Sequence, residues 1–359
     1  MRPTVAIIWL CYNNLRHLPE VVASWAAQTY PHDRLVVYAL PAGSPDGIAE
    51  VIRRDVLPRS GKDLPEVVLL DTGKNEGFCG NNNVGIRAAL ERGVDYVFLQ
   101  NGDLFLDAKA IEAAVTLAES DATIGAVQST VFFWHDHEKV NVTGGAIHAA
   151  GYGYARDNGK RIDEVTLRDG EEIAYASGAA VLRPADVYRS IGLLEEGFFM
   201  YHDDLEYGLR TKIAGYKNVL SAQSHGFHDY QFSRNPGKFV WMETYRWVVL
   251  LAYLRVPSML VLLPLWLAIE VGTWLMMAKS RMIAVKIGAY KAWLSPKTWR
   301  LTRDIRHRAK RLRTIPDREL VRLWTGKIEA QEASSPLLER VINPVVDAWW
   351  RALRKIIVW

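Results

Sequence analysis

The sequence predicts an α/β fold built on a mostly parallel sheet, followed by helices that associate with a membrane. Two observations lead to this prediction. Short apolar runs alternate with segments of helical periodicity through residues 5–99, which is the pattern of a parallel sheet covered by helices on both faces. Beyond residue 240 the 359-residue chain becomes basic and rich in tryptophan, and one stretch there is almost wholly apolar.

The alternation begins near the N-terminus. Residues 5–10 form a short apolar run without helical periodicity, which indicates a buried strand, and residues 15–28 repeat apolar side chains at helical spacing. The same reasoning predicts strands at 35–40, 67–70 and 96–99, and helices at 46–54 and 82–91. Ligands bind beyond the carboxyl ends of parallel strands, so the loops after residues 10, 40, 70 and 99 are expected to line a site.

From about residue 120 to residue 234 the sequence is irregular and rich in glycine, tyrosine and histidine. Repeated glycines between positions 144 and 159 are turn signals. We therefore expect loops around a groove here, rather than a further part of the sheet.

The charge of the chain is unevenly distributed. Residues 1–240 carry 23 Lys and Arg against 31 Asp and Glu, a net charge of −8, whereas residues 241–359 carry 21 against 9, a net charge of +12, and ten of the thirteen tryptophans. A basic, Trp-rich segment behind an acidic body favours contact with an anionic membrane surface. Nucleic acid is the competing partner, but a single basic patch is unspecific for it, and we expect none.

Residues 256–278 are almost wholly apolar and are interrupted by Pro257, Pro264 and Glu270. The stretch is long enough for a bilayer of about 30 Å, although its uncharged core, 256–269, is short. Twelve Lys and Arg then follow between positions 279 and 313, against one Asp. If this basic segment and the ligand-binding body both stay in the cytosol, the chain crosses the membrane zero or two times, and a re-entrant or surface-lying helical pair is favoured.

The C-terminal stretch, residues 337–359, has helical periodicity. It places five apolar side chains on one helical face: Val341, Val345, Trp349, Leu353 and Ile356. Both an interfacial helix and a helix that packs back on the body are consistent with this pattern.

Asn101, Gly102 and Asp103 follow the predicted strand 96–99 almost directly. A carboxylate there projects from the end of the sheet into the ligand crevice, where it can hold Mg²⁺ or Mn²⁺ bridging two phosphates. An Asn-Gly-Asp sequence after a strand is also a common turn, so the motif alone decides nothing.

A second group of acidic residues, Asp203, Asp204 and Glu206, places three carboxylates within four positions. They repel one another unless a cation compensates them, and a solvated acidic helix start is the alternative interpretation. The aromatic stretch 198–201 precedes them and would wall a pocket. One of the two aspartates could then act as a general base towards a hydroxyl group.

The order of the motifs resembles the large inverting glycosyltransferase family 2, with its nucleotide-binding GT-A fold, over residues 5–316. Rhamnosyltransferase-like and galactofuranosyltransferase-like members are the most similar. No single landmark is specific, whereas their order is. The landmarks are residues 24–31, 44–47, 75–85, 101–103, 177–180, 203–206 and 214–216.

The resemblance implies a role for each matching residue. Asp103 matches the last acid of the family's DxD-type motif, a metal and diphosphate ligand, with Asn101 in the first position. His228 falls where the family places a metal-binding histidine, and His225 is the alternative if the register slips by three. Asp204 matches the general base, with Asp203 beside it. Further residues expected to contact the donor are Tyr12, Asp46, Asn75, Gly77 and Asn83.

One segment departs from the family pattern. Members usually end the second strand with Asp-Asn-Gly-Ser, whose Asp helps to read the nucleobase, and this chain has Pro41, Ala42, Gly43 and Ser44 there. Base recognition is then expected elsewhere, from backbone groups near residues 10–12 or from Asp71.

The implied function is inverting transfer of a rhamnose-like or galactofuranose-like sugar from a nucleotide-sugar donor to a hydroxyl of a glycan, in cell-surface polysaccharide synthesis. The membrane-seeking tail favours a lipid-linked acceptor at the cytoplasmic face of the membrane, with a soluble acceptor as the alternative. We expect a GT-A catalytic domain at 1–235, a membrane-associating helical region at 236–315 and a helical tail at 316–359.

Three other functions have sequence requirements that can be compared with this chain. A nucleotide-sugar-binding module without activity is suggested by Pro41 and Asn101, and is opposed by Asp103, Asp204 and His228. A processive synthase would need several spanning helices and usually a Q-x-x-R-W motif, and the sequence shows neither. A Rossmann NAD enzyme would need a G-x-G-x-x-G turn after the first strand, and the sequence lacks it there.

Overall fold

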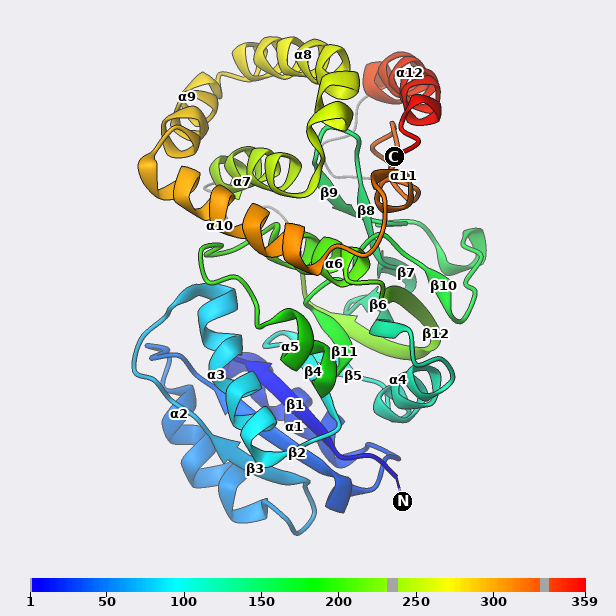
Figure 1. Cartoon of the computed structure of the whole chain (residues 1–359). Coiled ribbons are helices and arrows are strands. Elements are labelled where there is room, and N and C mark those ends of the chain that lie inside the picture. The colour runs from blue at the N-terminus through cyan, green and yellow to red at the C-terminus, as the bar shows by residue number, and fades with distance from the viewer. Residues whose placement is uncertain (1, 231–237, 330–335) are drawn as a thin grey trace.

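The computed structural model describes residues 2–230, 238–329 and 336–359, and within these ranges the centre of the molecule is a ten-stranded mixed sheet (Figure 1). Its strands are β1 (Val5–Leu10), β2 (Leu35–Leu40), β3 (Glu66–Leu69), β4 (Tyr96–Asn101), β5 (Leu104–Leu106), β6 (Ile124–Phe133), β7 (Asp136–Val142), β10 (Glu171–Glu172), β11 (Ala180–Pro184) and β12 (Lys217–His228). The main order is β10-β12-β6-β11-β4-β1-β2-β3, with β5 paired to β12 and β7 paired to β6.

The N-terminal half of the sheet is parallel, as predicted. Strand β1 pairs in parallel with β2 and β4, and β2 pairs in parallel with β3. The side chains of β1 alternate between two apolar layers: Ala6 and Ile8 lie in one, and Val5, Ile7 and Trp9 in the other. Because both faces are buried, the strand reads as a continuous apolar run.

Helices cover both faces of this half. They are α1 (Leu18–Ala26), α2 (Ile48–Val51) and α3 (Gly77–Arg92), whereas α4 (Ala110–Glu119) packs on β6, β11 and β12, and α5 (Ala185–Ile191) packs on β11. Helix α3 begins five residues before the predicted segment 82–91. The prediction missed its first turns because they are rich in Gly and Asn and lack apolar periodicity. The predicted helix 46–54 is a short α-helical turn that continues as the wider turn η3 (Ile52–Val56).

The region after residue 120 corrects the sequence prediction. It contains loops, but it also supplies β6, β11 and β12 to the main sheet. Strand β11 pairs antiparallel with β4, and β12 pairs in parallel with β6. The prediction failed because Gln128, Ser129 and Thr130 are polar yet fully buried, so the middle of β6 does not read as an apolar strand.

A small hairpin and a short helix complete the body of the protein. The hairpin consists of β8 (Gly145–Ile147) and β9 (Gly153–Ala155), which form a separate two-stranded sheet. Helix α6 (Asp203–Ile213) carries the acidic residues at its first turn.

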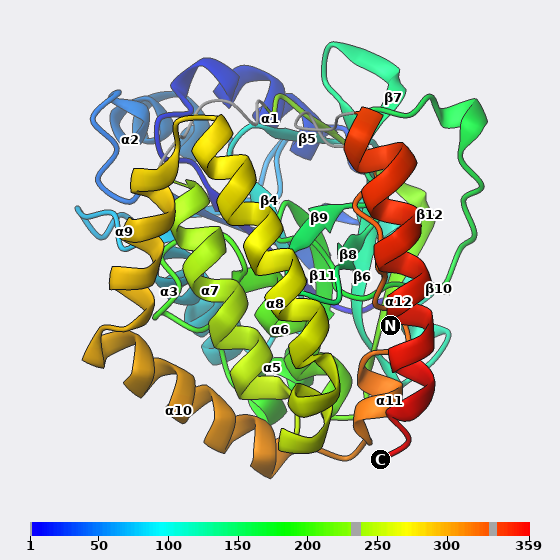
Figure 2. The same cartoon turned by 90° about the horizontal axis from the view of Figure 1, so that it is seen from above.

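A helical layer covers one end of this body, and Figure 2 looks down on it. Its members are α7 (Lys238–Tyr253), α8 (Val256–Lys279), α9 (Ile283–Trp293), α10 (Pro296–Leu312), α11 (Asp317–Leu320), η7 (Leu338–Ile342) and α12 (Asn343–Ile356). Among the described residues, α8 is the one helix long and apolar enough to cross a membrane. The predicted boundary at 235/236 lies outside the described residues, and the boundary at 315/316 falls between α10 and α11.

Candidate active site

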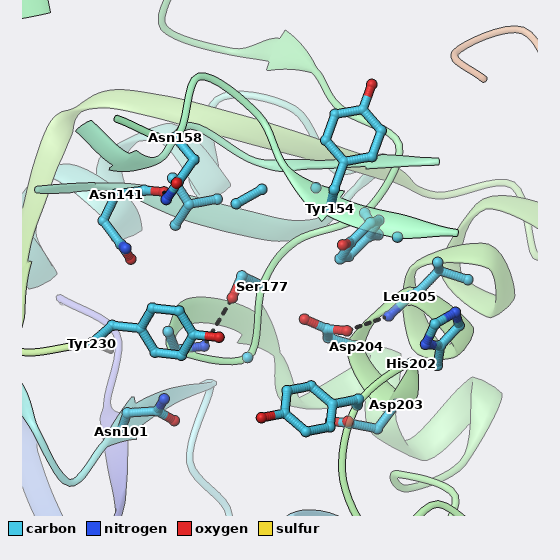
Figure 3. Close-up of a pocket in the computed structure, with 18 of the residues that line it drawn as sticks. Asn101, Asn141, Tyr154, Asn158, Ser177, His202, Asp203, Asp204, Leu205 and Tyr230 are labelled. Atoms are coloured by element: carbon cyan, nitrogen blue, oxygen red, sulfur yellow. Dashed lines mark hydrogen bonds between the residues drawn. The ribbon is translucent and has the colours of Figure 1, made fainter. Parts of the chain in front are cut away.

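A cavity of about 320 Å³ opens where β4 ends, beside the N-terminus of α6 (Figure 3). Its wall brings Asn101 from the end of β4 together with Asp203 and Asp204 from α6 and His228 from the end of β12. Asp103 is the hydrogen-bond partner of His228. The two acidic motifs of the sequence, about a hundred positions apart, therefore belong to one site.

Asp103 and His228 form a close pair. The Oδ1 atom of Asp103 lies 3.0 Å from Nε2 of His228, and the other ring nitrogen, Nδ1, lies 3.2 Å from Oδ1 of Asn141. His228 is buried, whereas the Asp103 side chain is about 20% exposed. Histidine 225, the alternative from the sequence, points elsewhere: its Nε2 donates to the carbonyl of Ala222, and it does not line the cavity.

The pair fits a divalent cation of the Mg²⁺ or Mn²⁺ type. Two ligand atoms at about 2.1 Å from one ion and at right angles to each other lie about 3.0 Å apart, which is the observed separation of the Asp103 and His228 atoms. The described residues contain no cluster of three or more His, Cys, Asp or Glu suited to a metal. Such ions are commonly held by one or two protein ligands, with phosphate oxygens and water completing the shell.

The protein keeps Asp103 ionised. Burial raises the pKa of its carboxyl, but the charge and hydrogen bond of His228, with a smaller contribution from His17, lower the pKa below its ordinary value. A carboxylate that stays charged beside His228, which lines the cavity, is suited to bind a cation.

The chain enters α6 through two residues in an unusual conformation. Tyr201 and His202 have φ angles of +66° and +61°, a region that side chains other than glycine rarely occupy. The His202 ring is held by a 3.1 Å hydrogen bond between Nε2 and the carbonyl of Gly151. Burial lowers the pKa of His202 to about 4, so the ring is neutral. Strain of this kind persists where the surroundings fix it, and here it directs the first turn of α6 towards the cavity.

The two aspartates at the start of α6 differ from ordinary surface carboxylates. Burial raises the pKa of Asp204 to about 6, against the opposing effects of backbone N–H groups of Leu205 and Gly178 and the charge of Arg183. The Leu205 N–H donates to Oδ1 of Asp204 at 2.8 Å. Burial and the neighbouring Asp204 charge also raise the pKa of Asp203 well above its ordinary value. Asp204 is thus a carboxylate that titrates near physiological pH, as a general base requires.

Glu206 has a different environment from its two acidic neighbours. It is fully buried, forms an ion pair with Arg210 and accepts a 2.6 Å hydrogen bond from the Tyr253 hydroxyl. Arg308 lies 3.3 Å from the same carboxylate. Burial raises the pKa of Glu206, but the two arginines outweigh this effect and lower it. Glu206 joins α6 to α7 and α10 and does not line the cavity.

Asp46 holds two loops at the carboxyl edge of the sheet together. Its carboxylate accepts hydrogen bonds from the Ser44 hydroxyl at 2.7 Å and from the Leu15 N–H at 2.8 Å. Tyr12 lies half-buried in the loop that follows β1 and leads to Leu15. Asp71, a candidate for base recognition, accepts from the N–H of Gly43 at 3.0 Å and so holds the segment that departs from the family pattern.

The segment 75–83 positions the loop that leads to α6. The Gly77 N–H donates to the Asn75 side chain at 2.9 Å. Gly77 has a φ of +78°, and a Cβ there would lie 2.4 Å from the Phe199 carbonyl oxygen. Asn83 is buried, and its amide bonds both the N–H and the C=O of Leu194. None of the five further residues that the sequence predicted to contact the donor lines the cavity. The segment 75–83 instead contacts the loop 193–202, which leads to the site.

The sequence interpretation missed a set of polar and aromatic residues in the cavity wall. They come from β7, from β9 and the loop after it, and from the segments that follow β10 and β12. They include Tyr175 and, labelled in Figure 3, Asn141, Tyr154, Asn158 and Tyr230. The high content of Gly and Tyr between residues 144 and 175 was the available signal, since aromatic rings with a hydroxyl suit the faces and edges of sugars.

Residues 3–248 match the family described as Glycosyltransferase like family 2. The low-salt glycan biosynthesis hexosyltransferase Agl10 of Haloferax volcanii is 28% identical over 152 residues, which is 41% of this chain and 47% of that protein. The chain therefore spans about half the length of this relative.

Solved structures share the fold at low sequence identity. GalNAc-T7 with UDP, GalNAc and Mn²⁺ superposes with a TM-score of 0.53 at 13% identity, over 69% of this chain and 48% of that chain. The mannosyltransferase PcManGT of Pyrobaculum calidifontis, in complex with GDP-Man and Mn²⁺, gives a TM-score of 0.51 at 17% identity over 86% of both chains. TarS of S. aureus gives 0.50 at 13% identity, over 98% of this chain and 55% of that chain.

Proposed function

Because the chain belongs to glycosyltransferase-like family 2 and has the GT-A fold, we propose that it is an inverting glycosyltransferase acting on a nucleotide-sugar donor. The observation that supports this most strongly is one cavity whose wall contains both Asp204 and His228, the partner of Asp103. A base and a site for the donor's diphosphate are the two parts that such a transfer needs.

In the proposed reaction, Asp204 accepts the proton of an acceptor hydroxyl while its oxygen attacks the anomeric carbon of the donor. The bond from that carbon to the nucleoside diphosphate breaks in the same step, and the diphosphate leaves with the electron pair. Attack from the face opposite to the leaving group inverts the anomeric centre. A pKa of about 6 leaves Asp204 largely ionised at neutral pH and still basic enough to accept a proton.

Asp103 and His228 are the residues that would hold Mg²⁺ or Mn²⁺, which neutralises charge on the leaving diphosphate when bound. The PcManGT and GalNAc-T7 structures contain Mn²⁺ together with a nucleotide or nucleotide sugar, which supports the same dependence here. Asn101 lies on the cavity wall beside this pair and contributes an amide to the donor side of the site.

The finer parts of the proposal concern the substrates. A galactofuranose-like sugar is supported by the sequence of the acidic motif at 203–210, and a rhamnose-like sugar by the resemblance of the C-terminal part to rhamnosyltransferases. A lipid-linked glycan acceptor, used in cell-surface polysaccharide synthesis at the cytoplasmic face of the membrane, is supported by the apolar helix α8. A binding module without activity is less consistent with an Asp204 carboxylate inside the cavity whose pKa, about 6, lies near neutral pH.

The test is a thermal-shift screen of nucleotide sugars with and without Mn²⁺, followed by measurement of nucleoside diphosphate release from each stabilising donor. We expect one donor class to raise the melting temperature when Mn²⁺ is present and to be slowly hydrolysed, with water as acceptor. A donor that stabilises the protein but yields no diphosphate, with or without glycan acceptors, would support the binding module instead.

A further inference from the structure

Helix α8 has two apolar faces that differ in what covers them. One face is buried on the protein through Leu262, Leu265 and Trp266, and the Trp266 Nε1–H donates to the Ala149 carbonyl at 2.8 Å. The opposite face is exposed along its whole length, with side chains 43% to 68% exposed: Val256, Leu260, Leu263, Leu267, Val271 and Leu275. Their spacing of three and four residues forms one continuous stripe.

The C-terminal helix adds a second exposed apolar stripe. Val341 on η7 and Val345 on α12 are 53% and 62% exposed, whereas Trp350 is buried and its Nε1–H donates to the Trp324 carbonyl at 3.1 Å. Figures 1 and 2 show α8 and α12 at the same end of the molecule. We call the α8 stripe together with Val341 and Val345 the outer face.

The outer face is flanked by positive charge. Arg255 immediately precedes α8, and Lys279 and Arg281 lie at its C-terminal end, all with exposed side chains. The α8 stripe is a continuous exposed apolar surface, and a surface of this extent marks an interaction site. Basic residues at both ends of an apolar stripe match a bilayer with anionic headgroups. The lipid acyl chains bury the apolar side chains, and the headgroups pair with the basic residues.

Glu270 shows how α8 is held on the protein. Its carboxylate faces inward, pairs with Arg246 and lies 2.8 Å from Lys286 Nζ, and it accepts a 2.8 Å hydrogen bond from Tyr290. Arg246 and Lys286 are almost completely buried. Both cations also pair with Glu243. If α8 left the body to cross a bilayer, they would lose Glu270 and share Glu243, which leaves one buried positive charge uncompensated and is strongly unfavourable in a low-dielectric interior.

We propose that the outer face binds the surface of an anionic bilayer, with α8 lying along the membrane and not crossing it. The β8–β9 hairpin lies between α8 and α12 (Figure 2), and its Tyr154 lines the cavity. Binding through the outer face therefore brings this wall of the cavity close to the lipid surface. The consequence for a lipid-linked acceptor rests on the proposed function, whereas binding to lipid does not.

The first test is flotation of the full-length protein with vesicles, without donor or acceptor. We expect binding to phosphatidylcholine vesicles that contain about a third phosphatidylglycerol, and weaker binding to phosphatidylcholine alone. The double substitution Leu263→Glu/Leu267→Glu should weaken binding by about tenfold or more, because two apolar contacts are replaced by charges.

The control is Thr116→Glu, which adds one negative charge, against two in the double variant, at an exposed position of α4 away from the outer face. It should bind vesicles like the wild type, and unchanged melting temperatures would show that all variants are folded. A wild type that does not float, or a double variant that floats as well as Thr116→Glu, would overturn the proposal. Either result would leave diphosphate release in solution, the measure of the proposed function, unaffected.

The second test separates lying from crossing. Arg255→Cys and Ser280→Cys place a thiol at each end of α8, and the native Cys11 and Cys79 are buried. On sealed vesicles with protein added from outside, a membrane-impermeant maleimide should label both variants equally and the wild type hardly at all. Labelling of one end and protection of the other would show that α8 crosses, and the proposal would be wrong.

Discussion

Asp103 and His228 are 125 positions apart in the sequence, yet their side chains approach to 3.0 Å because β5 pairs antiparallel with the end of β12. Neither residue alone holds a divalent cation firmly, and together they supply a carboxylate and an imidazole to one ion. We expect Asp103→Asn and His228→Ala each to weaken Mn²⁺-dependent binding of a nucleoside diphosphate by at least about tenfold in calorimetric titration.

His225→Ala is the matched control for this pair. It removes a histidine side chain three positions away, whose ring bonds the Ala222 carbonyl and does not line the cavity. Its affinity for Mn²⁺ and nucleotide should stay within about twofold of the wild type. If His225→Ala weakened binding and His228→Ala did not, the register assigned to the metal-binding histidine would be wrong.

Asp204 is expected to act in transfer and not in donor binding. Asp204→Asn removes the base while keeping the size and the hydrogen bond from Leu205, so turnover should fall by about 10²- to 10⁴-fold, the range for general base catalysis. Donor affinity in the presence of Mn²⁺ should change little. Asp186→Asn, at an exposed aspartate of α5 paired with Arg189, is the control, and turnover equal to that control would remove Asp204 as the base.

The pKa of Asp204 sets a pH dependence with a definite sign. Because burial raises that pKa to about 6, the free enzyme loses its base as the pH falls through 6, and kcat/KM should decrease towards acid pH with a slope of one. Initial rates at a fixed low donor concentration across this range measure the effect. The residual activity of Asp204→Asn should lack this limb, whereas a limb that persists would assign the ionisation to another group.

The same raised pKa also predicts a stability effect. A carboxyl whose folded pKa lies above its unfolded value is favourable for stability below the unfolded pKa, and this contribution is lost as the pH rises through the folded pKa. Asp204→Asn should therefore raise the melting temperature at pH 8 relative to the wild type, and the gain should vanish below about pH 4. Melting curves at the two pH values test this, and a variant less stable at pH 8 would contradict it.

The parallel half of the fold was predictable because its strands are buried on both faces and read as apolar runs, as in Val5 to Leu10. The other half was not. Strand β6 carries Gln128, whose buried side chain bonds the Ala180 carbonyl and the backbone of Ser177. Polar groups satisfied by distant partners remove the apolar pattern, and those partners are fixed by the three-dimensional fold and not by local spacing.

The site was predictable to a similar degree. Asp103 and Asp204 could be singled out by their positions after a strand and at a helix start, but pairing Asp103 with His228 depended on the family resemblance, because no local pattern joins them. The two faces of α8 could not be distinguished from the sequence, for a different reason. Trp266 and Leu267 are adjacent and both apolar, and only the packed structure shows that the first is buried and the second 58% exposed.

Gly77 and Gly93 offer a controlled test of how the segment 75–83 shapes the site. The two glycines lie at opposite ends of α3 with nearly equal φ angles of +78° and +79°. A Cβ at Gly93 would meet nothing within 4 Å, whereas at Gly77 it would lie 2.4 Å from the Phe199 carbonyl oxygen. Substitution by alanine therefore adds the same backbone strain at both positions, and a steric clash at Gly77.

Gly93→Ala should cost about 1 kcal/mol of unfolding free energy, from the left-handed conformation alone, and leave turnover of the folded protein unchanged. Gly77→Ala should cost about 3 kcal/mol or more and also lower turnover, because relief of the clash shifts the Phe199 backbone, which leads through Tyr201 and His202 to Asp204. Urea unfolding and turnover per folded molecule separate the two effects. Equal losses in both variants would mean that the contact between Gly77 and Phe199 does not position the base.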